Sequence, residues 1–190
     1  MGERPLDLRD RAITSILKTT AARNSSVRLL RLGDIDFERA NIRFRRAKGA
    51  KTLDVALQPE TRATLLVYLE RGRPLLVEQA RADDEADPGW LFVSACQSDG
   101  VQPLSMNAVS LMLTRRYHAG GGSLRTFGSH RIRHATATLL VNNGMPLEEV
   151  SRYLGHSSTD VTRRYARQTP DALGRRAAEA LERSGLVGVG

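Results

Sequence analysis

Apolar residues recur about every three or four positions over most of this chain, which is the spacing of an amphipathic helix. The first such segment is 6–22, followed by a short second helix that carries Val27 and Leu30. Further helices are predicted over 61–78, 106–117, 129–142, 146–154, 157–165 and 170–184. We expect Pro74 to kink or divide the helix that contains it, because proline lacks a backbone N–H.

Two short segments, 42–45 and 53–57, instead alternate apolar and polar residues, as half-exposed strands do. A small antiparallel β-meander over 35–57 accounts for both of them. Residues 90–93 are predicted to form a further short buried strand. The pattern therefore predicts a mainly α (α+β) fold, helical with a small antiparallel β-sheet near the N-terminal third.

The turn between the two alternating segments carries Gly49 at its tip, with Lys48 and Lys51 on either side. Lysines in such a place often protect an exposed sheet edge from pairing with other chains. A role in chemistry therefore needs support from elsewhere in the chain, and the turn position favours Lys48 over Lys51.

The composition narrows the class of partner. A net charge of +8 and a pI of about 10.5 favour a polyanion, nucleic acid before membrane. The lone Cys96 allows no disulfide within the chain, which fits a reducing cytoplasm. No apolar run approaches the roughly 18 residues that a membrane span needs. We expect a cytoplasmic, nucleoid-associated protein without a membrane partner.

The most informative stretch is 129–167, which holds His130, His134 and His156, several arginines and Tyr165. It has no cysteine or acidic cluster, so we expect no metal site and no cofactor. Imidazole, guanidinium and phenol groups, which outnumber the carboxylates of this stretch, suit an anionic substrate such as a phosphodiester.

On the predicted helix 129–142, helical spacing places His130, Arg133 and His134 on one polar face. Ile132, Ala135 and Leu139 would then lie toward the core. Taken singly, these features have ordinary explanations, since a basic stripe is usually solvated and a tyrosine such as Tyr165 usually packs in a core.

The order of the motifs along the chain changes this assessment. H-x-x-R-H begins at His130, Leu-Gly-His ends at His156, and Tyr165 follows nine residues later. Upstream, residues 20–26 read T-A-A-R-N-S-S, and 34–36 read D-I-D. This series resembles the tyrosine recombinases, the phage-integrase family, in which T-G-L-R-x-S-E precedes D-I-D and a lysine-bearing hairpin turn. The resemblance includes all six positions that are catalytic in that family.

Three of the six positions concern the nucleophile and its protons. The resemblance implies that Tyr165 joins a DNA 3′-phosphate, that Lys48 protonates the departing 5′-oxygen, and that His130 is an acid/base near the nucleophile. A phenol has an ordinary pKa of about 10, so it needs such help to attack a phosphodiester at neutral pH.

The other three positions concern the phosphate. The resemblance implies that Arg23 and Arg133 clamp its non-bridging oxygens and that His156 binds one oxygen. Two planar guanidinium groups bind phosphate oxygens in a bidentate way that single lysines do not match. Since they supply the positive charge, the implied mechanism is independent of metal ions.

Two residues depart from the family motif, Ala21 where glycine is usual and Ser26 where glutamate is usual. The first predicted helix also starts close to residue 1. We therefore expect residues 1–190 to form a single catalytic domain that lacks the family's N-terminal DNA-binding (core-binding) domain. The tail 170–190 is expected to be a helix that packs either on a neighbouring protomer or on its own domain.

The resemblance implies a site-specific recombinase that cuts and rejoins double-stranded DNA through a 3′-phosphotyrosyl intermediate. It also implies self-association on DNA in a tetrameric synapse. Two alternatives stay open at this point. One is DNA relaxation of the type IB topoisomerase kind, which shares the chemistry. The other is a non-catalytic DNA-binding module or regulator with the same fold.

Overall fold

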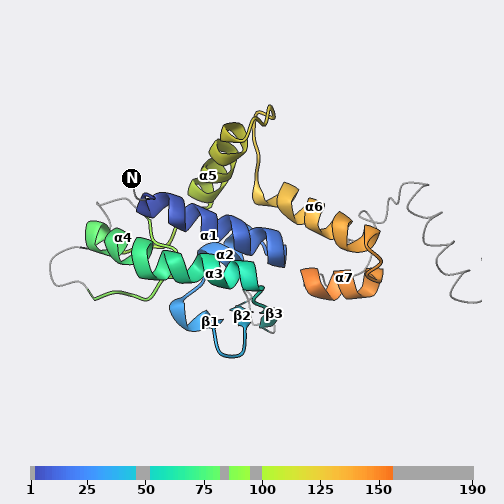
Figure 1. Cartoon of the computed structure of the whole chain (residues 1–190), viewed down its shortest axis with the longest axis horizontal. Coiled ribbons are helices and arrows are strands. Elements are labelled where there is room, and N and C mark those ends of the chain that lie inside the picture. The colour runs from blue at the N-terminus through green and yellow to red at the C-terminus, as the bar shows by residue number, and fades with distance from the viewer. Residues whose placement is uncertain (1–2, 46–51, 82–85, 95–99, 156–190) are drawn as a thin grey trace, which may run out of the picture. The chain divides into compact units, whose positions relative to one another are not determined.

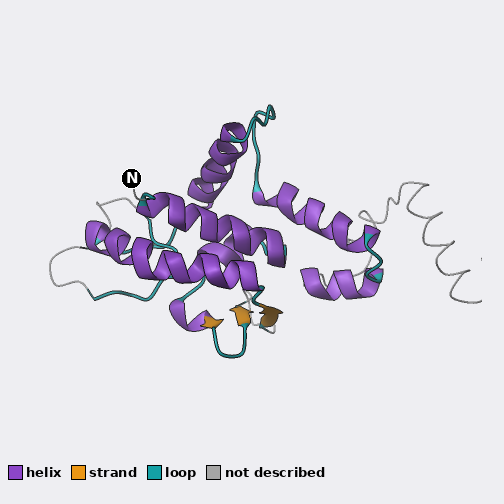
Figure 2. Cartoon of the chain, in the orientation of Figure 1, coloured by secondary structure: helices purple, strands orange, loops and turns teal. Residues whose placement is uncertain are grey.

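The computed structural model describes residues 3–45, 52–81, 86–94 and 100–155 (Figure 1). The chain divides into two compact units, of which the first ends at Arg133 and the second begins at His134. Within the described residues, helices dominate and the strands form one small sheet (Figure 2), which confirms the predicted fold class.

Helix α1 (Pro5–Thr20) is the central element of the first unit. Its buried face consists of residues with at most 1% exposure, namely Ala12, Ile13, Ile16 and Leu17. These apolar residues have the helical spacing that predicted a helix over 6–22. The helix packs against α3 (Pro59–Val67) and the π-helical turn η2 (Tyr68–Gly72).

The predicted helix 61–78 is divided, as its proline indicated. Helix α3 runs into η2, and α4 (Arg73–Ala80) follows with Pro74 in its first turn. Pro74 offers no N–H to the carbonyl of Glu70 and its ring crowds that carbonyl, so the turn before it widens. At Gly72, an added Cβ would lie 2.9 Å from Cδ2 of Tyr68 and 3.2 Å from Cβ of Leu8. The approach of α1 to η2 therefore requires glycine.

The predicted β-meander is present. Strands β1 (Ile35–Asp36), β2 (Asn41–Phe44) and β3 (Leu53–Ala56) form an antiparallel sheet in the order β1-β2-β3. Ile42 pairs with Val55, and Phe44 pairs with Leu53 at the end of the hairpin next to its turn. The alternation has its expected cause, because Ile42, Phe44 and Val55 are buried whereas Arg43 and Asp54 are exposed.

The predicted strand at 90–93 is wrong. Trp90 makes an isolated bridge to Arg31, and Val93 makes another to Pro103. Because the two ends of the segment pair with different parts of the chain, no ladder forms between them. The segment is nevertheless buried, since Leu91, Phe92 and Val93 are fully enclosed. The ring of Phe92 stacks on Tyr68, and the Tyr68 hydroxyl donates to the carbonyl of Leu91.

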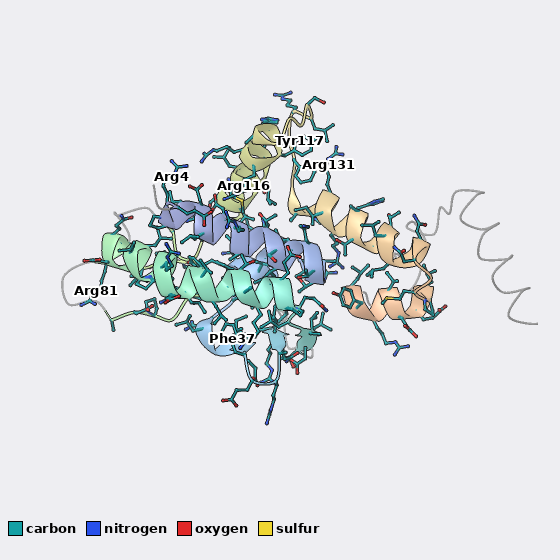
Figure 3. The ribbon with its side chains drawn as sticks, viewed as in Figure 1. Arg4, Phe37, Arg81, Arg116, Tyr117 and Arg131 are labelled. Carbon is teal, nitrogen blue, oxygen red and sulfur yellow. The ribbon has the colours of Figure 1, made fainter. Side chains whose placement is uncertain are left out.

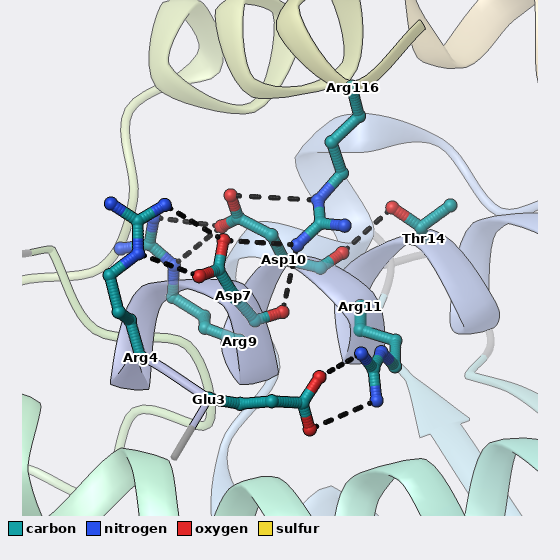
Figure 4. A network of polar contacts seen from close by, with 8 residues as sticks. All are labelled: Glu3, Arg4, Asp7, Arg9, Asp10, Arg11, Thr14 and Arg116. Atoms are coloured by element: carbon teal, nitrogen blue, oxygen red, sulfur yellow. Dashed lines mark hydrogen bonds and ion pairs between the residues drawn. The ribbon is translucent and has the colours of Figure 1, made fainter. Parts of the chain in front are cut away.

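Helix α5 (Met106–Ala119) begins after Ser105, whose side chain accepts a hydrogen bond from the N–H of Ala108 at 3.0 Å. It is joined to α1 through Arg116, which points toward α1 in Figure 3. Nη2 of Arg116 donates to the main-chain oxygen of Asp7 at 2.9 Å, and Nε lies 3.8 Å from Oδ2 of Asp10 (Figure 4). The side chain of Arg116 thus connects α5 to α1 through polar contacts.

The segment between α5 and α6 (Ser129–Asn142) folds back on α5. The N–H of Phe127 donates to the Thr114 hydroxyl at 2.9 Å, and the rings of Phe127 and Tyr117 stack with centroids 4.3 Å apart. These contacts fix the chain immediately before α6, which begins at Ser129, one residue before His130.

In the second unit, the end of α6 is followed by α7 (Leu147–Leu154). Gly144 (φ 95°) lies between the two helices, and Gly155 ends α7 in the left-handed region (φ 62°). The helix predicted over 146–154 therefore ends where expected, because glycine at the C-cap adopts a positive φ without steric cost.

Candidate active site

The site begins where α1 ends. Ala21 is the C-cap of α1 with φ 50° and ψ 25°, the left-handed conformation, and it is fully buried. A residue with a Cβ is disfavoured there by about 1–2 kcal/mol, whereas glycine is not. The structure thus gives a physical reason for glycine at this motif position, and this chain tolerates alanine there.

Arg23 follows two residues later and is exposed. It occupies the N-cap position of the short helix α2 (Asn24–Arg28). Its main-chain oxygen accepts hydrogen bonds from the N–H groups of Ser26 and Val27, at 2.9 and 3.1 Å. The turn therefore holds the backbone of Arg23 through main-chain contacts, one of them to the position where glutamate is usual in the family motif.

Arg133 is only 6% exposed and lies on the buried side of α6. Its Nη1 donates a hydrogen bond of 2.6 Å to the main-chain oxygen of Ala21. This contact joins residues 112 positions apart. It brings Arg133 to the turn that leads to Arg23, the other arginine of the predicted phosphate clamp.

The two described histidines of the motif lie elsewhere on α6. His130 and His134 are both exposed, and Nδ1 of His134 lies 3.4 Å from the Thr138 hydroxyl. The predicted common face of His130, Arg133 and His134 is therefore wrong in part. Positions 130 and 133 are about 60° apart around a helix, enough for one to face solvent and the other the core.

The predicted core face of this helix is also corrected. Ala135 and Leu139 were expected inside, but Ala135 is exposed and Leu139 is 60% exposed, although Ile132 is buried as predicted. The buried face instead follows residues spaced by four, namely Ser129, Arg133, Ala137 and Val141. Small side chains and one arginine occupy it, so hydropathy alone did not identify it.

Lys48, His156 and Tyr165 lie outside the described residues. For Lys48, both strands of its hairpin are described, and the pairing of Phe44 with Leu53 ends the ladder before its turn. Of the six predicted site residues, the structure thus places Arg23, His130 and Arg133, and links the two arginines through Ala21.

Sequence reasoning gave no role to two features of this region. One is the main-chain oxygen of Ala21, for which the signal was alanine at a position where the motif has glycine. The other is Asp34, whose D-I-D motif was noted only for its register. Among the described residues, no group of three or more His, Cys, Asp or Glu side chains is placed to hold a metal ion. No helix of the described part is long and apolar enough to cross a membrane.

Solved structures with a similar fold include two Xer recombinases. The XerA recombinase matches with a TM-score of 0.74 and 25% identity over 92% of this chain and 57% of its own. The XerH recombinase, in a post-cleavage complex with its palindromic difH substrate, matches in fold with a TM-score of 0.72 and 22% identity. The match covers 94% of this chain and 47% of the XerH chain. The fold is therefore that of the recombinase class.

Residues 1–171 match the phage integrase family, and the chain belongs to that family. This confirms the resemblance drawn from the motifs. Tyrosine recombinase XerC of Oceanobacillus iheyensis is 33% identical over 89% of this chain and 52% of its own length. A protein of Sinorhizobium fredii, provisionally named integrase/recombinase y4rF, is 36% identical over 89% of this chain and 37% of its own length. The chain spans about half or less of the length of these relatives.

Proposed function

We propose that this chain is the catalytic part of a site-specific recombinase that cuts and rejoins double-stranded DNA through a phosphotyrosyl link. The observation that carries the proposal is the hydrogen bond from Arg133 to the oxygen of Ala21, two residues before Arg23. It joins the two parts of the chain that hold the predicted phosphate clamp. Membership of the phage integrase family supports the same reading.

In the proposed reaction, the phenolic oxygen of Tyr165 attacks the scissile phosphorus and the bond to the 5′-oxygen breaks. His130 accepts the phenolic proton, and Lys48 donates a proton to the departing 5′-oxygen. The product is a 3′-phosphotyrosine and a free 5′-hydroxyl. Attack by the 5′-hydroxyl of another strand reverses the step and releases the tyrosine.

Arg23, Arg133 and His156 stabilise the negative charge that builds on the non-bridging oxygens during both steps. The two arginines differ in their surroundings, since Arg133 is buried and Arg23 is exposed. A buried guanidinium bonded to the protein has little freedom to move, so its orientation is fixed before DNA binds. Arg23 is then the member that adjusts to DNA.

Because the guanidinium groups supply the positive charge, the proposed reaction needs no metal ion. The phosphotyrosyl bond keeps the energy of the phosphodiester, so rejoining needs no ATP. Exchange between two duplexes requires several protomers, and we propose a tetrameric assembly on DNA. Such a reaction takes place on DNA in the cytoplasm, at the nucleoid.

The test is incubation of the protein with a nicked suicide duplex, followed by a denaturing gel. The proposal expects a covalent protein–DNA band with wild type and no band with Tyr165→Phe. Absence of the band across varied DNA at low salt overturns it, and DNA binding that is unchanged in Tyr165→Phe then indicates a binding module. Relaxation of any supercoiled plasmid by a monomer, without strand exchange, indicates topoisomerase-like action instead.

A further inference from the structure

The sequence between Asp99 and Glu148 contains no acidic residue, although the whole chain has 21 aspartate and glutamate residues among 190. The stretch includes α5, the connection to α6 and the start of α6 (Figure 1). Its arginines are Arg115, Arg116, Arg125, Arg131 and Arg133. A surface formed by this stretch therefore carries positive charge without carboxylates of its own.

Two of these arginines are engaged within the fold. Nη2 of Arg116 donates to the main-chain oxygen of Asp7, and its guanidinium lies 3.8 Å from the carboxylates of Asp7 and Asp10. Arg133 donates to the oxygen of Ala21. The acidic side chains that α1 offers near α5 are thus taken by Arg116, and they do not neutralise the other arginines of α5 and its connection.

Arg115 and Arg125 differ from this pair. Both are exposed, and within the part of the chain that the structure describes neither side chain makes a hydrogen bond or an ion pair. Arg131, on the first turn of α6, is exposed as well. Each guanidinium carries five N–H donors. The donors of Arg115 and Arg125 contribute no polar contact to the described fold, which leaves them for a ligand.

His118 brings the main chain of Arg125 to the side of α5 that carries Arg115. Arg115 and His118 are three residues apart on the helix, so they are neighbours on its surface. Nε2 of His118 lies 2.7 Å from the main-chain oxygen of Leu124, the residue before Arg125. Two unpaired guanidinium groups therefore extend from neighbouring points of the backbone.

The connection is held on both sides of Arg125. Before it, the oxygen of Leu124 is bonded to His118. After it, the N–H of Phe127 donates to the Thr114 hydroxyl at 2.9 Å. The backbone that carries Arg125 is thus ordered in the absence of a ligand, so binding does not have to include the cost of ordering it.

We propose that Arg115 and Arg125 bind the phosphate backbone of double-stranded DNA next to the site of cleavage. The proposal rests on the proposed function in taking double-stranded DNA as the partner. Guanidinium groups bind phosphate oxygens through paired N–H donors. Arg125 precedes His130 by five residues, and Arg133 follows on the same helix. The two contacts therefore hold the duplex beside the residues that act on the scissile phosphate.

The test is the salt dependence of duplex binding, measured by fluorescence anisotropy from about 50 to 200 mM salt. Arg115→Gln combined with Arg125→Gln removes two phosphate contacts. We expect the slope of log K against log salt to fall by about 1.8, at about 0.9 for each contact. The affinity should fall by the same factor on duplexes of unrelated sequence, because phosphate contacts carry no sequence information.

Arg71→Gln combined with Arg81→Gln is the matched control. Both arginines are exposed, and neither side chain has a hydrogen bond or ion pair among the described residues. In contrast to Arg115 and Arg125, they have acidic neighbours in the sequence. Glu70 precedes Arg71, and Asp83 follows Arg81 by two residues. The control removes the same two charges from the chain and should leave the slope unchanged.

A third variant separates charge from folding. Arg115→Lys combined with Arg125→Lys keeps both charges and should retain most of the wild-type slope. A slope that falls as much with lysine as with glutamine overturns the proposal, because the loss then does not follow the charge. Thermal melts of all the variants accompany the binding curves.

Three further results count against the proposal. An equal fall in slope for both glutamine pairs overturns it, because net charge alone then sets the affinity. An unchanged slope for Arg115→Gln with Arg125→Gln overturns it too. A loss confined to one duplex sequence indicates contacts to bases and rejects the assignment to phosphates.

The suicide-duplex assay separates this proposal from the proposed function. If wild type forms the covalent adduct while the slope of the Arg115→Gln and Arg125→Gln pair stays at the wild-type value, this proposal fails alone. If the slopes change as expected but wild type forms no adduct, the proposed function fails and the phosphate contacts stand.

Discussion

Arg133 donates a hydrogen bond of 2.6 Å to the main-chain oxygen of Ala21, 112 positions earlier in the chain. The acceptor belongs to a residue in the left-handed conformation that ends α1. The direction of that carbonyl depends on the backbone angles of Ala21, and the place of Arg133 depends on the carbonyl. The positive φ of Ala21 and the burial of Arg133 are two uncommon local features, and this one hydrogen bond links them.

Replacement of Ala21 tests this conformation. We expect Ala21→Val to lower the free energy of unfolding by about 2 kcal/mol or more, because a β-branched residue rarely adopts φ 50° and the site is fully enclosed. Ala21→Gly is the control and should lie within about 1 kcal/mol of wild type, since relief of strain offsets the lost methyl group and the more flexible unfolded chain. Denaturant unfolding measures both, and a wild-type value for Ala21→Val would contradict the left-handed turn.

The two arginines should respond differently to the same substitution. Arg133→Lys loses the fork that reaches the oxygen of Ala21, so we expect lower thermal stability and about 10²–10³-fold slower adduct formation. Arg23→Lys should slow the reaction by a similar factor without a change in stability, because Arg23 is exposed. Thermal melts and suicide-substrate kinetics on both variants check this, and equal loss of stability would be evidence against the buried role of Arg133.

The contact of η2 with α1 predicts a strong effect of one methyl group. Gly72→Ala places Cβ 2.9 Å from the ring of Tyr68 and 3.2 Å from Leu8, so we expect a loss of about 1–3 kcal/mol in the free energy of unfolding. Gly33→Ala is the matched control. Nothing lies within 4 Å of its Cβ position, so its effect should stay within about 1 kcal/mol. Urea denaturation of the pair measures the difference.

Burial raises the pKa of Tyr68 to about 12 from its ordinary value of about 10. The folded protein therefore holds this proton more tightly than the unfolded chain does. The stabilisation is complete below pH 10 and is lost as the pH rises toward 12, by about 2–3 kcal/mol in total. Tyr68→Phe should lose about 1 kcal/mol at neutral pH with its bond to Leu91, and should show less of this alkaline loss. Unfolding curves from pH 8 to 12 test the comparison.

DNA binding by this chain should be weak and should fall steeply with salt. Its affinity depends on phosphate contacts, and each contact adds about 0.9 to the slope of log K against log salt. The chain spans about half or less of the length of its relatives, so fewer contacts are expected than in the longer proteins. Fluorescence anisotropy between 50 and 200 mM salt measures the slope. Nanomolar affinity that does not change with salt would contradict an electrostatic interface.

The helices and strands were predictable because their signals are local. Repeated apolar residues predicted α1, and the caps at Ser105 and Gly155 involve only the adjacent helical turn. The alternation at 42–45 predicted β2 for the same reason. The prediction of a strand at 90–93 was wrong because an apolar run indicates burial but does not identify a pairing partner.

The order of the motifs along the chain, which the sequence alone determined, was sufficient to identify the family. The tertiary structure decided which side of α6 faces inward, since Arg133 is buried while His130 is exposed on the same turn. It also decided that the oxygen of Ala21 receives Arg133 and that Asp34 receives Arg45. The reason is physical. Backbone angles and helix caps depend on neighbours in sequence, whereas the partner of a buried charge depends on which distant segments pack against it.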